Sequence, residues 1–268
     1  MSVRISAVAN NLVRLWTRKL ELVGNKAFAA DQDLKLATMD TMLMGDSPSA
    51  VDLAYNSLSI IPTSLDTNEG VANIPQSNFP PLQMAINHLT ESIEQLRFLP
   101  LPVYITKIFI QDLSPSWRKS RNMVSKFIDY SIAEAQFRES DASKKKLGEE
   151  LATDADCVVD MIAQREAREG EEKFDNEELR DELMTFVLAG QDTASIVMSW
   201  LVKYLPQDME IQRKLHDEVC LAFGPKEDHE SQGFDIVADP GKTPVLEAVV
   251  AETLRCARVA PMIARECE

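Results

Sequence analysis

The sequence predicts a mostly α-helical fold, and three observations support this prediction. In most segments, apolar residues recur at steps of three and four, the period of a helix with one buried face. One segment, residues 176–205, keeps this pattern over a length that is unusual for a globular domain. Short strands are expected only within residues 57–62 and 258–266, so we expect no sheet of substance.

Two helices are predicted before the first long connection. The first has one apolar face, made of Val8, Leu12, Leu15, Trp16, Leu20 and Val23. Gly24 is suited to end it, because glycine readily takes the left-handed conformation of a helix C-cap. The second helix runs from about Asp31 to Met44 and stops at Gly45. Residues 46–81 are polar and rich in proline, serine and asparagine, which predicts a long irregular connection.

The middle of the chain predicts three further helices. The first covers about Leu82 to Arg97, and a proline-broken segment follows it up to Ser114. Pro115 then opens a long helix through Glu139, since proline is favoured in the first helical turn. This helix has an apolar stripe that we assign to core packing: Trp117, Val124, Ile128 and Ile132. A short helix is expected over residues 154–168.

The long central helix is predicted between Asp175 and Pro206. Asp175 and Glu178 have the spacing of a capping box, and Pro206 cannot continue a helix. About 30 residues at 1.5 Å each give a length of about 45 Å. The half after Leu183 is apolar on nearly all sides, so we expect it to be buried.

Two helices complete the pattern. One is predicted from Asp208 to Phe223. Thr243 as N-cap and Pro244 in the first turn then open a helix over about residues 244–257, which ends before Pro261.

Composition excludes several classes of protein. The chain has 268 residues, of which 45% are hydrophobic and 26% charged, a globular composition. A formal net charge of −15 argues against nucleic acid as a partner, because phosphates attract basic surfaces. The four cysteines have no CxxC spacing and the three histidines no ligand spacing, which argues against a metal cluster or a disulfide framework. Residues 1–20 lack the uninterrupted apolar core of a signal peptide, and no apolar run reaches about 18 residues, so we expect no signal peptide, membrane anchor or membrane-spanning segment in this sequence.

The segment Leu188 to Thr193 carries the first candidate chemistry. Gly190 removes side-chain bulk, so a flat group or a diatomic molecule can lie close to the helix backbone. Thr193 follows Ala189 by four residues, so its hydroxyl can bond back to that carbonyl and loosen the turn. Asp192 adds a carboxylate that can relay protons. The alternative interpretation is an ordinary helix with a packing notch of small residues.

The second candidate is a charged pair on the helix 244–257. Glu252 and Arg255 lie at i and i+3, so they share one helix face. Their apolar neighbours, Val249, Val250 and Leu254, predict partial burial. Such pairs are also common on exposed helices, where they contribute little to stability.

Together and in this order, AGQDT (189–193) and ETLR (252–255) resemble the oxygen-activating helix and the ExxR helix of the cytochrome P-450 family of heme-thiolate monooxygenases. The resemblance implies a partial cytochrome P-450 fold, with residues 1–268 as a single incomplete domain of the eukaryotic kind. Thr193 would position oxygen and a water, and Asp192 would relay protons. Thr185, Phe186, Ala189 and Gly190 would line the oxygen groove and the substrate pocket.

The resemblance also implies the remaining parts of the site. Glu252 and Arg255 would be a structural pair, completed in the family by an arginine further along. Arg265, after Pro261, is the candidate for contact with a heme propionate, with a surface arginine as the alternative. Neither Cys256 nor Cys267 has the neighbours of the family's iron ligand, so the thiolate is missing from this sequence. Trp16 to Arg18 is likewise not the family's WxxxR motif.

The expected function is therefore that of a fragment of a monooxygenase. In its full-length form it would contain heme and insert one atom of O2 into an apolar organic substrate. Electrons would come from NADPH through NADPH-cytochrome P-450 reductase, at the cytosolic face of the endoplasmic reticulum membrane. Without its iron ligand, the chain itself is expected to be inactive. The alternative is a non-catalytic truncated or pseudogene product that binds no heme.

Overall fold

The computed structural model describes residues 2–24, 26–42, 49–58, 67–68, 71–72, 74, 79–98, 102–109, 113–145, 159, 162, 175–224, 239, 241–257 and 259. The described helices and their bounds are α1 Ser2–Val23, α2 Asp31–Met42, α3 Ala50–Leu58, α4 Pro81–Phe98, α5 Val103–Lys107, α6 Pro115–Lys145, α8 Asn176–Tyr204, α9 Met209–Phe223 and α11 Pro244–Cys256. A short 3-10 turn, η2 Leu205–Gln207, follows α8. The predicted mostly α-helical fold is confirmed.

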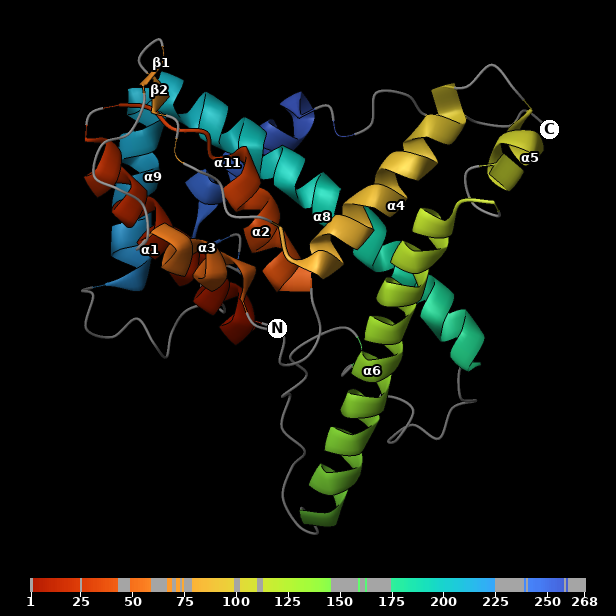
Figure 1. Cartoon of the computed structure of the whole chain (residues 1–268). Helices are drawn as coiled ribbons and strands as arrows, with labels where there is room; N and C mark the ends of the chain where they lie inside the picture. Colours follow the sequence, from red (N-terminus) through yellow and green to blue (C-terminus); the bar gives the residue numbers. More distant parts are fainter. Residues whose placement is uncertain are drawn as a thin grey trace, which may run out of the picture.

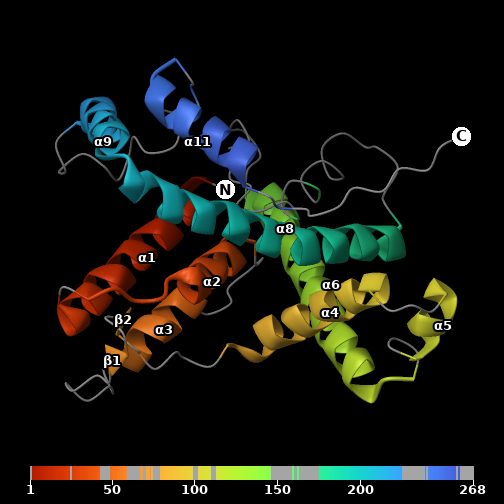
Figure 2. The same ribbon diagram turned by 90° about the horizontal axis from the view of Figure 1, so that it is seen from above.

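The long helix α8 is the element around which the others are arranged. Seen from above, it runs along the molecule, with α1, α2 and α3 beside its C-terminal half and α4 and α6 beside its N-terminal half (Figure 2). The helices α9 and α11 lie by its C-terminal end. In the orthogonal view, α4 and α6 cross the N-terminal half of α8 (Figure 1). Among these neighbours, α2, α4, α6 and α11 pack against α8 directly.

The core consists of two hydrophobic clusters. One joins α4, α6 and α8, and its fully buried members include Ile86, Val124, Ile128 and Leu183. The predicted stripe of α6 belongs here, with Trp117 packed against the edge of the cluster. The other cluster joins α1, α2 and α3 with the short hairpin; its buried members are Leu12, Leu15, Val23, Leu34, Leu36, Ala37, Ala50, Val51, Ala54, Leu58, Ala72 and Ile74.

A buried ion pair holds α1 against α2. The ammonium of Lys19 lies 2.7 Å from Asp33 Oδ1, and both side chains are almost fully buried. Lys19 Nζ donates to both oxygens of this carboxylate at 2.7 Å, and Trp16 Nε1 donates a third hydrogen bond, at 3.0 Å to Oδ2. A buried charge is costly without partners, and here each oxygen of the Asp33 carboxylate has at least one hydrogen-bond donor.

Asp40 connects α2 to the start of α3. Its carboxylate accepts hydrogen bonds from the backbone N–H groups of Ala50 and Val51 and from the hydroxyl of Ser49. It therefore satisfies donors that the first turn of α3 leaves free. Burial raises the pKa of Asp40, although these three hydrogen bonds act in the opposite direction.

The connection 46–81 contains more structure than the sequence predicts. It includes the helix α3 and an antiparallel hairpin of β1 Thr67–Asn68 and β2 Val71–Ala72. The prediction of an irregular connection was therefore wrong for residues 50–58. A strand over 57–62 was wrong for residues 57 and 58, which end α3. The reason is tertiary: α3 buries four apolar residues against α1 and α2, and Asp40 caps it.

Helix bounds elsewhere lie close to the predicted ones. Gly24 has a φ of 62° and its N–H donates to Leu20 O at 2.9 Å, so it ends α1 as predicted. The helix α6 continues to Lys145, six residues beyond the predicted end. The proline-broken segment contains α5. The stop at Gly45, the strand at 258–266 and most of the helix 154–168 lie outside the described residues.

The two ends of α8 differ from the prediction in detail. Asp175 is the N-cap residue, but its side chain accepts no hydrogen bond from the first turn, so the capping box is not formed. At the other end, Pro206 lies in η2, where the α-helix gives way to the tighter turn. Of the apolar second half, Val187 is buried, whereas Phe186 and Met198 are about 40% exposed. The expected burial is therefore wrong for Phe186 and Met198.

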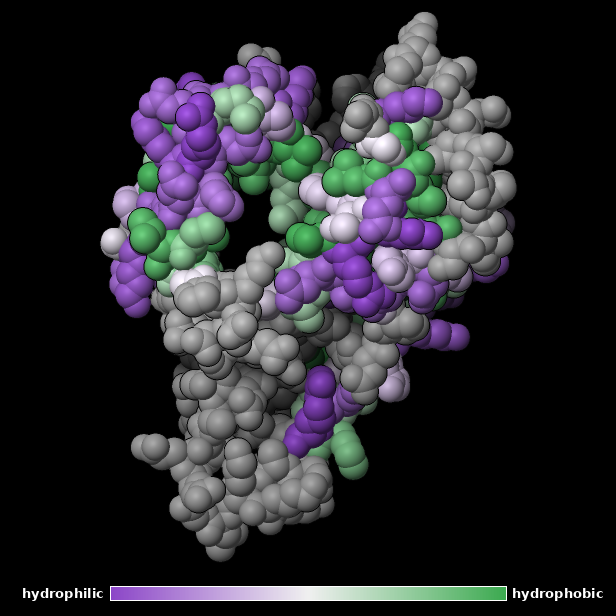
Figure 3. Space-filling view, turned by 90° about the vertical axis from the view of Figure 1, so that its left-hand side faces the viewer, coloured by the Kyte–Doolittle hydropathy of each residue, from purple (hydrophilic) through white to green (hydrophobic). Residues whose placement is uncertain are grey.

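By length and composition, one helix in the described part of the chain is apolar enough to cross a membrane, Glu177–Gln207. The sequence analysis expected none. This segment comprises most of α8 and the turn after it, and its packing against α2, α6 and α11 fits a central helix of the fold. A space-filling view from the side shows apolar residues bordering a deep hollow between two parts of the molecule (Figure 3).

Candidate active site

The Thr193 hydroxyl is held against the backbone of its own helix. Its Oγ1 donates to Ala189 O at 2.9 Å and approaches Gly190 O at 3.3 Å. This is the back-bond that the four-residue spacing predicts. The helix nevertheless stays α-helical through this turn, so the bond does not open α8.

Gly190 allows a close approach between α8 and α2. A Cβ at this position would lie 3.2 Å from Met42 Sδ and 3.3 Å from Met42 Cε. Sequence reasoning assigned the space left by the missing side chain to a flat ligand or a diatomic molecule. The structure shows that the space beside Gly190 is also bordered by the end of the Met42 side chain.

Five of the predicted residues line one cavity. It has a volume of about 460 Å³ and takes its walls from one side of α8 and from Ile162. The predicted residues in it are Thr185, Phe186, Ala189, Gly190 and Thr193. The sequence analysis missed Glu182 and Leu183, which also line it. Glu182 lies one helical turn before Phe186, a spacing that was available in the sequence.

Asp192 does not line this cavity. It is half-buried on the neighbouring side of α8, and its backbone carbonyl accepts a hydrogen bond from the Ser195 hydroxyl at 2.9 Å. Asp192 is thus the sequence neighbour of Thr193, but the structure places it outside the walls of the Thr193 cavity.

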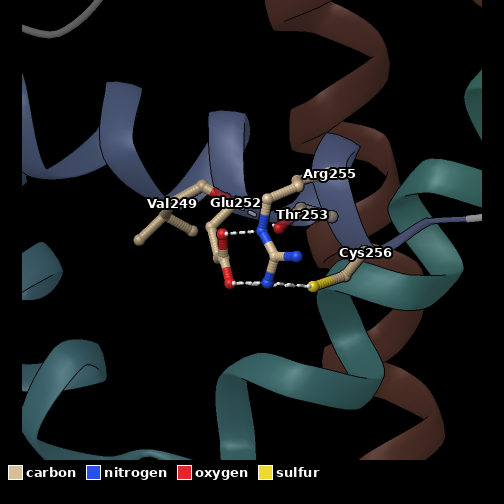
Figure 4. A network of polar contacts seen from close by, with 5 residues as sticks. All are labelled: Val249, Glu252, Thr253, Arg255 and Cys256. Carbon is tan, nitrogen blue, oxygen red and sulfur yellow. Dashed lines mark hydrogen bonds and ion pairs between the residues drawn. The ribbon is translucent and has the colours of Figure 1, made fainter.

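Glu252 and Arg255 form a two-bond ion pair on α11. Arg255 Nε donates to Glu252 Oε2, and an Nη donates to Oε1, both at 2.7 Å (Figure 4). The hydrogen bond from Arg255 holds the pKa of Glu252 below its ordinary value. The bond to Glu252, followed by the nearby Cys256 thiol, raises the pKa of Arg255.

The predicted burial of this pair is wrong. The Arg255 side chain is 70% exposed and that of Glu252 is 61% exposed. Their neighbour Leu254 is 54% exposed as well. The main neighbours of α11 are α8 and α9, and their packing leaves the pair largely open to solvent.

The start of α11 is held by a residue that the sequence analysis missed. Thr243 is the N-cap, but its side chain makes no capping bond. Glu218 of α9 supplies it instead: its two carboxylate oxygens accept from Val245 N at 2.8 Å and Leu246 N at 2.9 Å. Carboxylates are favourable at helix N-termini, where N–H groups lack partners. No local pattern reveals this bond, since α9 and α11 are separated by a long connection.

A second cavity lies between α8, α9 and α11, with a volume of about 620 Å³. Its walls are mostly apolar, and Glu252, Thr253 and Cys256 lie at one side. The Cys256 Sγ is 3.4 Å from an Arg255 nitrogen and 3.7 Å from Glu252 Oε1. Cys256 does not border the Thr193 cavity. The candidate Arg265 and Cys267 lie outside the described residues.

A family model described as Cytochrome P450 matches residues 64–268, which include both motifs. The chain belongs to the cytochrome P450 family. Curated relatives agree, although each is only distantly similar. A cytochrome P450 monooxygenase GME11363 from Pestalotiopsis microspora is 26% identical over 80% of this chain and 38% of its own length. The cytochrome P450 monooxygenase TRI13 from Fusarium sporotrichioides is 26% identical over 95% of this chain and 45% of its own length.

Similarity also extends to cytochrome P450 52-M1 from Starmerella bombicola, 25% identical over 59% of this chain and 28% of that protein. The chain spans less than half the length of each of these three relatives. Membership of the family confirms the resemblance inferred from the motifs, and heme is the cofactor that the family implies.

Among the described residues, one wall of the Thr193 cavity suits a flat group such as heme. Ala189, Gly190 and Thr193 give a wall of small side chains on which a flat group can lie. The described cysteines are Cys220 and Cys256, and neither borders this cavity. Within the described residues, no group of three or more His, Cys, Asp or Glu side chains is arranged to hold a metal ion.

Proposed function

We propose that this cytochrome P450, at the full length of its relatives, is a heme-thiolate monooxygenase. It inserts one oxygen atom of O2 into an apolar organic substrate and uses electrons from NADPH. The observation that carries the proposal is the Thr193 cavity, which gathers a back-bonded hydroxyl, a glycine and an alanine on one side of a long helix. The alternative of a non-catalytic product without heme is not favoured, because a family model matches most of the chain.

Heme, when bound, would supply the activation of oxygen. For the residues of this chain, we propose that they deliver protons to the site. The Thr193 hydroxyl is anchored by Ala189 O, so its oxygen keeps a fixed place at the cavity wall and can hold a water there. Asp192 lies beside it in sequence and on a different side of α8, which suits a carboxylate that takes protons from solvent. Glu182, at the wall of the same cavity, is an additional acid within this region.

The other predicted roles remain proposals. Thr185 and Phe186 line the cavity one turn before Ala189 and would contact the substrate. Glu252 and Arg255 would hold the opposite side of the domain, where a further arginine would complete the network and bury the pair. Arg265 would contact a heme propionate. NADPH-cytochrome P450 reductase and the cytosolic face of the endoplasmic reticulum are the proposed partner and location.

The test of these roles uses the full-length enzyme and two variants. Thr193→Ala should keep heme and substrate, because the hydroxyl serves proton delivery. NADPH consumption should continue while product per NADPH falls, with peroxide released instead. Asp192→Asn should slow NADPH consumption and product formation together, by about 10² or more, since a general acid contributes that much.

Ser199→Ala is the matched control. Ser199 makes the same type of back-bond, to Ser195 O at 2.8 Å, but it does not line the Thr193 cavity. This variant should turn over and couple like the wild type. If Thr193→Ala and Asp192→Asn also behave like the wild type, the proton-delivery role is wrong. If the full-length protein forms no heme-thiolate spectrum at all, the proposed function itself fails.

A further inference from the structure

The polar side chains that line the Thr193 cavity offer hydrogen-bond acceptors and no free donor among the described residues. They belong to Glu182, Thr185 and Thr193. The Thr185 hydroxyl donates to Asp181 O at 3.0 Å, and the Thr193 hydroxyl donates to Ala189 O at 2.9 Å. Because a hydroxyl has one proton to donate, both threonines can only accept from a ligand. A ligand that forms hydrogen bonds to these side chains must therefore bring the donors.

Glu182 gives this wall its charge. The other described residues of the lining are threonine, glycine, alanine or larger apolar residues. Glu182 is exposed, and no described residue forms an ion pair with it. Its neighbour Arg180, by contrast, is already paired with Asp129 at 2.7 Å. A carboxylate attracts a cation and repels an anion, and the formal net charge of −15 acts in the same direction.

The carboxylate lies at one end of the cavity, away from the proposed oxygen site. Along α8, Glu182 is the first residue of the lining, and it precedes Gly190 by eight residues. This spacing is about 12 Å along the helix axis, and helical side chains lean toward the N-terminus, which carries the carboxylate further from Gly190. The apolar side chains of Leu183, Phe186 and Ala189 lie between the two positions. A ligand that reaches both ends needs an apolar body of about this length.

We propose that the substrate is an apolar amine, whose ammonium group pairs with Glu182 while its apolar end lies beside Gly190 and Thr193. This substrate class rests on the proposed monooxygenase function. The ammonium supplies the N–H donors that the wall lacks, and Glu182 holds the nitrogen away from the oxygen site. Oxygen is therefore inserted at a carbon remote from the nitrogen. A C–H bond there becomes C–O–H and the second oxygen atom leaves as water, while NADPH and one solvent proton supply the two electrons and two protons.

The binding test compares three probes with one apolar body on the purified 268-residue chain at low salt. These are 4-phenylbutylamine, 4-phenylbutan-1-ol and 4-phenylbutanoate, with a cationic, a neutral and an anionic end at neutral pH. Equilibrium dialysis gives each Kd from the absorbance of the free probe. The amine should bind about threefold to fivefold more tightly than the alcohol, as for an exposed ion pair, and the butanoate should bind most weakly. Added salt should reduce the preference for the amine.

Three variants assign the preference to Glu182. Glu182→Gln keeps the shape and removes the charge, so the amine and the alcohol should bind alike. Asp181→Asn is the matched control, because it removes the same charge from the adjacent exposed residue, which does not line the Thr193 cavity; the preference should remain. Ala189→Phe adds bulk at an exposed position of the wall and should weaken all three probes. Circular dichroism of each variant shows that the helices are retained.

The affinities can overturn the proposal in several ways. Equal binding of the amine and the alcohol by the wild type does so, and so does a preference for the amine that persists in Glu182→Gln or disappears in Asp181→Asn. A folded Ala189→Phe variant with unchanged affinities would place the probes at another site.

The full-length enzyme gives a second readout, the position of the oxidised carbon. Mass spectrometry of the products of 4-phenylbutylamine should find oxygen on the ring or on the carbon beside it, with the nitrogen retained. Loss of the nitrogen, which follows oxidation of the carbon next to it, would overturn the proposed substrate class and leave the monooxygenase function standing. A full-length protein without a heme-thiolate spectrum would remove the proposed function, whereas amine binding at Glu182 is judged by the affinities of the 268-residue chain.

Discussion

Gly190 illustrates how one residue can serve packing between helices and the shape of a cavity together. It borders the Thr193 cavity, and the end of the Met42 side chain lies at 3.2 Å from where its Cβ would be. A methionine end is flexible, so it can move by a few tenths of an ångström. A larger side chain would require α2 itself to move.

We therefore expect Gly190→Ala to change the free energy of unfolding by less than about 1 kcal/mol, since alanine also favours the helix by a similar amount. Gly190→Val should cost about 1–3 kcal/mol through overpacking. Urea denaturation measures both. Adding Met42→Ala to the valine variant should recover part of the loss; a valine variant as stable as the alanine one would show that Met42 does not limit this space.

Glu252 and Arg255 give a prediction about pH. The hydrogen bond from Arg255 lowers the pKa of Glu252, so the pair contributes stability above the unfolded pKa and loses it as the pH falls through the folded value. Because both side chains are exposed, we expect this contribution to be small.

In a carboxyl NMR titration, Glu252 should titrate below 4.5, its ordinary value. Arg255→Gln should move the midpoint back toward that value. Arg213→Gln, an exposed arginine on α9, serves as the control and should leave the midpoint unchanged. A Glu252 midpoint that ignores Arg255→Gln means that the pair does not persist in solution.

At the scale of elements, helix ends in this chain are often fixed by residues from other helices. Asp40 of α2 caps α3, and Glu218 of α9 caps α11. Asp208 is the local exception, because its side chain accepts from Glu210 N and Ile211 N at the start of its own helix. The sequence analysis placed Asp208 only as the first residue of this helix, although a local pattern can reveal such a cap. The other two caps depend on how the helices pack.

Glu218 provides the test at this scale. Glu218→Gln keeps the shape but loses the charge, so it should cost about 1 kcal/mol of stability. Hydrogen exchange should accelerate at the Val245 and Leu246 amides, which Glu218 holds. Asp217→Asn, its exposed neighbour, should change neither quantity. Exchange at Val245 that is unchanged in Glu218→Gln would show that water caps α11 equally well.

At the scale of the whole molecule, the C-terminal elements are only partly covered. Large apolar side chains are exposed on α9 and α11; these are Met209 57%, Leu221 86%, Val250 40% and Leu254 54%. The cavity between α8, α9 and α11 is also mostly apolar. Apolar patches of this kind attract other apolar groups.

We expect the purified chain to bind a hydrophobic dye and to associate as its concentration rises. Leu221→Gln with Leu254→Gln should reduce dye binding and association, and Leu53→Gln, on an α3 side chain that is 49% exposed, should not. Fluorescence titration and sedimentation measure the two effects. A monomer with one cooperative melting transition and no dye binding would contradict this expectation.

The sequence by itself determined the helical class, the bounds of most helices and the family. Local rules suffice for these, because period, proline and glycine act within a few residues, and because the spacings in AGQDT and ETLR place their residues on shared helix faces. The back-bond of Thr193 and the ion pair of Glu252 follow from the same short-range geometry.

Only the tertiary structure decided what depends on distant neighbours. Helix α3 forms in a stretch with irregular composition because α1, α2 and Asp40 support it. The Glu252 pair is exposed because burial depends on which element covers a face, and no pattern within α11 encodes that. The cavity of about 360 Å³ that Leu89, Trp117 and Met184 line likewise exists only because α4 and α6 meet on α8.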